Sequence, residues 1–247
     1  MKKLFYVLLA LGIMVSLCAC GSRKQSGQIK VSDSGKGYQV DKVFFQTYTK
    51  ENGEFFQGSF RVTNTGKTPL FLYNAAWVLK DQNGKVISPE TPLQIAVASP
   101  QNINPGETAW YIGSRHRNLV ADKPGEIAEA VPSFSATAYT SESDQRGTRY
   151  LDAVRISDLK LTEENGELIA TGIVENTGTV QVETILIYVN LYNEDGCLIG
   201  DLGWGTLNFA AGDKQSFTAT ASKTWPNPPL ALSSVASFDA YAVQMIH

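Results

Sequence analysis

Hydrophobic residues occupy every second position along several segments of this chain. Strict alternation is typical of β-strands that bury one face, because successive side chains point to opposite sides of a sheet. A one-residue slip would expose the apolar face, so the pattern also favours one register. The clearest runs are Phe56, Gly58, Phe60 and Val62; Phe71, Tyr73, Ala75, Trp77 and Leu79; Leu168, Ala170, Gly172 and Val174; and Ile185, Ile187, Val189 and Leu191.

These runs belong to an internal repeat. Val-Thr-Asn-Thr-Gly at 62–66 reappears as Val-Glu-Asn-Thr-Gly at 174–178, and the turn at 83–87 reappears at 195–199. Both pairs are 112 positions apart (62 to 174, 83 to 195). A period of this length indicates tandem domains rather than a solenoid of short units.

Other landmarks extend the repeat over most of the chain. Tyr38 and Tyr150 open the two copies, and Ser133-Phe134 is matched with Ser237-Phe238 at their ends. Asn83-Gly84 and Asp195-Gly196 predict two-residue type I′ hairpin turns, in which both residues need positive φ. We find no helical periodicity longer than one or two turns. About seven short strands per copy predict an all-β protein with two tandem Ig-like antiparallel β-sandwich domains.

The N-terminus has a different pattern. Lys2 and Lys3 precede an almost unbroken apolar run from Leu4 to Leu17, which predicts an export signal. The run is too short to span a membrane, which takes roughly 20 apolar residues. Leu17-Cys18-Ala19-Cys20 resembles the lipobox of bacterial lipoproteins, which implies that Cys20 is acylated through its sulfur after cleavage.

These observations predict four segments. Residues 1–19 are the lipoprotein signal peptide, and residues 20–36 are a polar, flexible tether. Residues 37–140 form the first Ig-like domain and residues 147–247 the second. The lipid at Cys20 would hold the protein on the outward face of a bacterial cell membrane, since two or more acyl chains anchor stably.

Charge and cysteine content narrow the possible partners. Loss of Lys2 and Lys3 with the signal would take the formal charge from −3 to −5, which gives no electrostatic footprint for nucleic acid. If Cys18 leaves with the signal and Cys20 carries lipid, Cys197 has no cysteine left to pair with. We expect Cys197 to be a small buried hydrophobe, with a reactive or pairing thiol as the alternative.

The second copy contains the segment 189–196 (Val-Asn-Leu-Tyr-Asn-Glu-Asp-Gly), preceded by 174–178 and followed by Ala211-Gly212-Asp213. In these residues it resembles the FxLYD domain family of bacterial lipoproteins. The first copy departs further, because Trp77-Val78-Leu79-Lys80-Asp81 lacks the tyrosine. The family implies an Ig-like fold outside the membrane, and no catalytic residues define it.

The residues that carry catalysis or bind metal are scarce. The two histidines are His116 and His247, and no cluster predicts a metal site. His116 lies between two arginines that would oppose an imidazolium, so we expect a solvated loop there. The Asp81 turn resembles the opening of a calcium loop but lacks its later oxygens, and a hairpin explains it. We expect no cofactor, no metal and no enzymatic activity.

Aromatic residues are the candidate contacts for a ligand. Trp77 lies in an alternating run and is expected in the core. Trp204, between two glycines, and Trp225, before a proline, are read as loop residues that could stack on a sugar or anchor a protein. Packing across a sandwich or between the domains is the alternative for both, and for Trp110.

The sequence therefore predicts a non-enzymatic, membrane-anchored extracytoplasmic lipoprotein with a binding or scaffold role. Two alternatives stay open: an accessory subunit of a membrane enzyme or transporter, and a module that binds cell-wall glycan. An accessory subunit would present a large apolar patch, whereas a glycan binder would present coplanar exposed aromatics.

Overall fold

The computed structural model describes residues 37–94, 96–122, 126–139, 146–221 and 228–246. Almost all of its regular structure is β. The first half contains β1 (Tyr38–Lys50), β2 (Gly53–Asn64), β3 (Leu70–Lys80), β4 (Val97–Ser99), β5 (Asn102–Ile103), β6 (Thr108–His116), the short helix α1 (Arg117–Val120) and β7 (Glu129–Ala138). The second contains β8 (Gly147–Tyr150), β9 (Val154–Glu164), β10 (Glu167–Asn176), β11 (Val182–Tyr192), β12 (Leu198–Phe209), β13 (Lys214–Thr220), the 3₁₀ turn η2 (Leu232–Ser234) and β14 (Ser237–Ile246).

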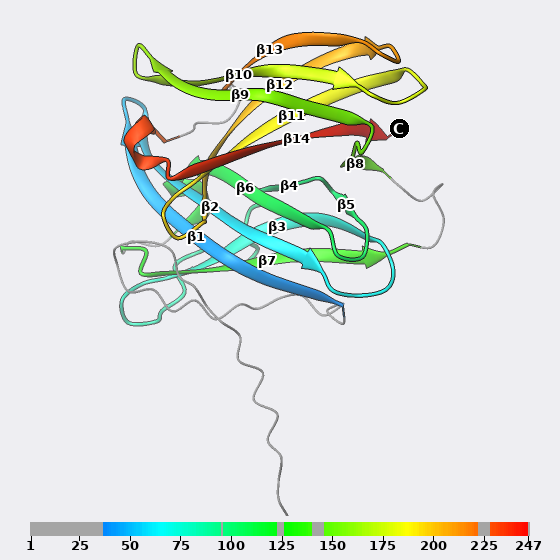
Figure 1. The fold of residues 1–247 in the computed structure, drawn as a ribbon. Helices are drawn as coiled ribbons and strands as arrows, with labels where there is room; N and C mark the ends of the chain where they lie inside the picture. Colours follow the sequence, from blue (N-terminus) through cyan, green and yellow to red (C-terminus); the bar gives the residue numbers. More distant parts are fainter. Residues whose placement is uncertain (1–36, 95, 123–125, 140–145, 222–227, 247) are drawn as a thin grey trace, which may run out of the picture.

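Each half is a β-sandwich with its own core. In the first, the sheet β1-β2-β6-β4 packs on strands β7, β3 and β5. In the second, β9, β10 and β13 pack on β12, β11 and β14. Figure 1 shows the two sandwiches stacked on each other, with β8 beside their junction. The predicted all-β class and the two tandem sandwiches are confirmed.

A single run of hydrogen-bonded strands links the two sandwiches. Its order is β7-β3-β5-β8-β14-β11-β12-β13-β10-β9. Strand β8 pairs with β14 in antiparallel fashion and with β5 in parallel fashion, through Asn102 and Arg149. The Asn102 amide nitrogen also donates to the carbonyl oxygens of Arg146 at 2.6 Å and Thr148 at 2.9 Å. The sandwiches are therefore joined by backbone pairing as well as by the chain that connects them.

The repeated Asn-Thr-Gly segments have the same structural role in both sandwiches. The buried Asn176 side chain donates to the carbonyl oxygens of Val180, Phe209 and Ala210, and its own oxygen accepts from the Gly178 N–H. In the first sandwich Asn64 donates to the carbonyl oxygens of Thr68 and Ile103 and accepts from the Gly66 N–H. Each asparagine satisfies backbone groups that a sandwich edge would otherwise bury unpaired. The repeat at 112 positions therefore marks a structural device rather than a binding motif.

The predicted buried face of β3 is wrong in the first part of the strand. Along β3 the buried residues are Leu70 and Leu72 before Asn74, and Ala75, Trp77 and Leu79 after it. Asn74 has φ +53°, and the pairing of β3 with β7 shifts there. This β-bulge reverses the side of the sheet to which side chains point. Phe71 and Tyr73 consequently lie on the outer face, where their rings stack at 5.4 Å. The corresponding face of β11 is buried as predicted.

The predicted type I′ turns are also wrong. Gly84 and Gly196 have positive φ, whereas Asn83 and Asp195 do not. In each turn the glycine N–H donates to the carbonyl three residues earlier, at Asp81 and at Asn193. A type I turn followed by a left-handed glycine accounts for this geometry.

The repeat diverges toward the end of each copy. On the β3–β7 ladder Ala130 lies opposite Leu79, and on the β11–β14 ladder Phe238 lies opposite Leu191. Phe238 therefore corresponds to Ala130 rather than to Phe134, which corrects the sequence match. Consistent with this, Phe134 is buried whereas Phe238 is exposed.

Candidate binding cleft between the sandwiches

The outer face of the sheet β1-β2-β6-β4 is covered by the second sandwich. The Ser59 hydroxyl donates to the carbonyl oxygen of Leu198 at 2.5 Å, and the Lys42 amine donates to that of Asp195 at 2.6 Å. The Tyr150 hydroxyl donates to the carbonyl oxygen of Thr108 at 2.6 Å. Because Ser59 and its neighbour Gln57 are almost fully buried, β2 has two buried faces.

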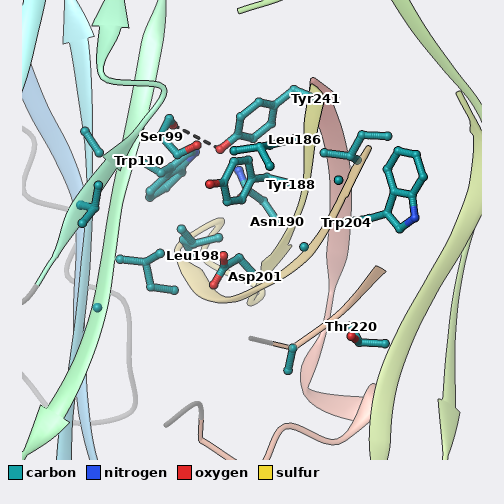
Figure 2. Close-up of a pocket in the computed structure, with 18 of the residues that line it drawn as sticks. Ser99, Trp110, Leu186, Tyr188, Asn190, Leu198, Asp201, Trp204, Thr220 and Tyr241 are labelled. Carbon is teal, nitrogen blue, oxygen red and sulfur yellow. Dashed lines mark hydrogen bonds between the residues drawn. The ribbon is translucent and has the colours of Figure 1, made fainter. Parts of the chain in front are cut away.

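Between these contacts the two sandwiches enclose a cleft of about 540 Å³. Its volume lies within the range of small-molecule binding sites, roughly 300–1,000 Å³. One wall comes from β2, β4 and β6 of the first sandwich, and the other from β11, β12 and β14 of the second. Figure 2 shows Ser99 and Trp110 on the first wall facing Tyr188, Asn190 and Asp201 on the second.

The register of β12 explains why the second wall is hollow. Gly203 lies opposite Tyr188 and Gly205 opposite Leu186, on the face of the sheet that lines the cleft. An added Cβ at Gly203 would meet no heavy atom within 4 Å. Trp204 between them lies opposite the buried Ile187, on the core face. Gly203 thus leaves space in the cleft, whereas Trp204 is among the lining residues and packs, partly buried, against the second core.

Asp201 is the charged group of the cleft. Among the described residues that line it, no other side chain carries a charge. Burial raises the pKa of Asp201 from 3.8 to about 6, while a hydrogen bond from its own backbone lowers it. Asp201 lies opposite Asn190, which lies opposite Asp239 on the next strand. Because residues directly opposite each other share a face, the Asp239 carboxylate lies on the same side of the sheet as that of Asp201. Burial raises the pKa of Asp239 too.

Two tyrosines border Asp201 in the cleft. The rings of Tyr188 and Tyr241 stack with their centroids 5.8 Å apart. The Tyr241 hydroxyl donates to the carbonyl oxygen of Ser99 at 3.2 Å, which is the dashed line in Figure 2. Burial, and then the charge of Asp201, raise the pKa of Tyr188 above 10.0. Both phenols therefore stay protonated and can donate or accept hydrogen bonds.

The first wall contributes a buried amide. Gln57 is 1% exposed, and its oxygen accepts from the amide nitrogen of Gln46 at 2.6 Å. Its own amide nitrogen has no hydrogen-bond partner in the described structure. An unpaired buried donor costs on the order of 1–3 kcal/mol. This nitrogen is an unsatisfied donor on a residue that lines the cleft.

The predicted site residues have different outcomes. Trp204 is wrong as a loop residue, since it lies within β12, and its indole packs on the Phe217 ring at 5.8 Å. Figure 2 shows this indole set apart from Tyr188 and Asp201. Its contact with a ligand stays a prediction. Trp225 and the proposed lipid site Cys20 lie outside the described residues.

Two other singled-out residues pack rather than face solvent. Trp110 is 7% exposed and contacts Tyr192 of the second sandwich, with ring centroids 5.5 Å apart. His116 ends β6 instead of lying in a loop, and its ring packs on Phe55 at 4.1 Å. Sequence patterning missed Asp201, Tyr188, Tyr241 and Gln57, because their juxtaposition depends on how the sandwiches dock.

Cys197 is fully buried, as predicted, and it is disulfide-bonded. The sequence prediction that it has no cysteine to pair with concerns the mature chain, after loss of Cys18 and acylation of Cys20, and it stays a prediction. Cys18 and Cys20, the other cysteines, lie outside the described residues. Within the described part of the chain, no three His, Cys, Asp or Glu residues are grouped to hold a metal.

Comparisons with known proteins add little. No family model matches the chain, and no curated protein matches it. Among solved structures, a match is a calcium-binding mutant (D341A D367A) of Bacteroides uniformis beta-glucuronidase 2, at 17% identity and a TM-score of 0.20. That match covers 72% of this chain and 23% of the other. Among the described residues, no helix is long and apolar enough to cross a membrane.

Proposed function

We propose that this chain is a non-enzymatic binding lipoprotein, anchored through Cys20 on the outward face of a bacterial membrane, that holds its ligand between two β-sandwiches. The cleft of about 540 Å³, with a partly buried carboxylate and aromatic walls, is the observation that carries the binding role. The anchor rests on the lipobox-like residues 17–20. The resemblance to FxLYD domains is part of the same proposal.

The lining favours binding over catalysis. Its described titratable side chains are Asp201, Tyr188 and Tyr241, with no histidine, cysteine or lysine among them. General acid–base catalysis uses groups that titrate near the working pH, and nucleophilic catalysis uses an activated nucleophile. A single carboxylate beside two neutral phenols is better suited to hold a ligand than to transfer protons in both directions.

The anchor is tested by replacing Cys20 with alanine. We expect the wild-type protein in the membrane fraction, with a lipid-modified Cys20 as its first residue by mass spectrometry. Cys20→Ala should be released from the membrane or remain unprocessed. An unmodified wild-type peptide that runs through Cys18-Ala19-Cys20 would refute the anchor.

The same experiment settles the pairing of Cys197. Acylation of the Cys20 sulfur and a disulfide at that sulfur exclude each other, and cleavage after Ala19 removes Cys18. We therefore expect the lipid-modified protein to yield Cys197 as a peptide that alkylates without reduction. A disulfide-linked Cys197 peptide in the membrane-bound protein would contradict the proposed processing.

The cleft is tested by filling it. Gly203 faces open space in an extended strand, so Gly203→Leu should keep the fold and occupy the cleft. We expect the wild-type protein to retain a component of isolated wall or membrane fractions that Gly203→Leu does not retain. Equal retention by the two proteins would place the binding surface elsewhere.

A further inference from the structure

We infer that the cleft between the sandwiches binds an organic cation, a protonated amine with a small apolar body, and that Asp201 is its charge partner. This inference rests on the proposed binding function and names the ligand class. It depends on the charge of the cleft, on its walls and on one unpaired donor.

Among the described residues that line the cleft, the charge is negative and no cation balances it. Within the described part of the chain, the hydrogen bond found at the Asp201 carboxylate comes from its own backbone N–H. The described lining holds no cation to neutralise it. Arg61, which covers the Trp110 ring at 5.8 Å, is held by Asp41 through two bonds of 2.7 Å. A partly buried carboxylate without a counter-charge is costly, and a ligand cation would offset that cost.

The walls fit the body of such a ligand. Tyr188, Tyr241 and Trp110 supply aromatic surface, and Leu186, Leu198 and Val97 supply aliphatic surface. Aromatic rings attract cations through their negative faces, and the attraction is greater where water is excluded. An anionic ligand would meet Asp201 without a compensating cation in the described lining. The lining therefore selects against phosphates and carboxylates.

The buried amide nitrogen of Gln57 adds a second requirement. Gln57 lines the cleft from the opposite wall, and its amide nitrogen has no partner among the described residues. A ligand that carries a hydroxyl or carbonyl oxygen, in addition to its amine, would satisfy both unpaired groups of the cleft. Leaving such a donor unpaired in a complex lowers affinity, so the pair of groups also discriminates among amines.

Tyramine and tyrosol are matched probes for this inference. They share a phenol ring and a two-carbon chain, and they differ in a protonated amine against a neutral hydroxyl. Calorimetric titration at pH 7.5 with the full-length protein in detergent should show tyramine binding about tenfold or more tighter than tyrosol. Asp201→Asn, which keeps the shape of the side chain, should remove that preference.

A matched control separates a local charge from the net charge of the protein. Asp158 is exposed on β9 and has φ +52°, a conformation that asparagine tolerates. Asp158→Asn should therefore bind both probes as the wild-type protein does. Gly203→Leu should bind neither probe, because its side chain occupies the cleft.

Three results would overturn the inference. One is equal affinity of the wild-type protein for tyramine and tyrosol, with both lost in Gly203→Leu. In that case the cleft binds, and the proposed function stands without the cation. Another is a loss of preference in Asp158→Asn as large as in Asp201→Asn. The third is no binding of tyramine up to about 10 mM. Retention of a wall component by the wild-type protein alone would then keep the binding role while rejecting this ligand class.

Discussion

Asp201 should make the protein less stable as the pH rises, and Asp201→Asn should remove that effect. The pKa of Asp201 is about 6 in the folded protein, against an ordinary value of 3.8. Between these values the folded state holds a proton that the unfolded state has released, so stability falls with rising pH. Above pH 6 the penalty reaches its full value, which for this shift is about 3 kcal/mol.

The variant isolates this penalty because asparagine does not titrate. At pH 7.5 Asp201→Asn should be more stable than the wild-type protein by up to about 3 kcal/mol, and at pH 4 by only about 0.5 kcal/mol. Tyr188 and Tyr241, which face Asp201, stay protonated over this range, and Asp239 is present in both proteins. Urea unfolding followed by tryptophan fluorescence at the two pH values measures the difference.

The matched control is again Asp158→Asn, which should change stability little at either pH. A gain for Asp201→Asn that is the same at pH 4 and pH 7.5 would refute the reasoning, because the penalty would not depend on ionisation. A loss of stability at pH 7.5 would show that the ionised carboxylate is favoured in the fold. The burial argument for Asp201 would then be wrong.

Three further predictions concern the cores and the repeat. Trp77 is 1% exposed and packs edge-on against Phe56 and Phe60, so Trp77→Ala should cost about 3–5 kcal/mol in urea unfolding; an unchanged midpoint would contradict its place in the core. Asn176→Ala leaves three carbonyls without their buried donor and should lower the free energy of unfolding by about 3 kcal/mol in the same assay; a loss near zero would show that these hydrogen bonds do not stabilise the sandwich. A fragment of residues 147–247 should unfold cooperatively by circular dichroism, because it contains the second core, and a disordered fragment would show that the sandwiches fold as one unit.

The class of fold could be predicted because its signals are local. Alternation and glycine-containing turns depend on residues that are close in sequence, and the repeat at 112 positions gave the same pattern twice. The bulge at Asn74 could not be seen, because Leu70, Phe71, Leu72 and Tyr73 are all apolar and either pair could form the buried face. A positive-φ asparagine within a strand leaves the periodicity ambiguous on both sides of it.

The cleft could not be predicted from the sequence for a different reason. Gly203 and Gly205 look like loop residues in the sequence, whereas in β12 Gly203 leaves its face of the strand open and Gly205 lies against the Leu186 side chain. The other wall comes from β2, β4 and β6, in the other half of the chain. Which faces of two sandwiches meet depends on contacts such as that of Ser59 with Leu198, which no local pattern encodes. No local sequence pattern therefore pointed to Asp201 as a residue of a binding site.

The strand β8 has a consequence for how a ligand would be chosen. It pairs with both sandwiches, and the Asn102 amide and the hydroxyl groups of Thr148 and Tyr150 add side-chain bonds at the same joint. The backbone pair Asn102–Arg149 and these side-chain bonds oppose a hinge movement of one sandwich toward the other, because such a movement would break them. If the cleft binds a ligand as proposed, its width would be fixed mainly by the folded structure, and the size of the ligand would decide whether it fits. A preformed binding site of this kind would exclude larger ligands and would lose little conformational freedom on binding.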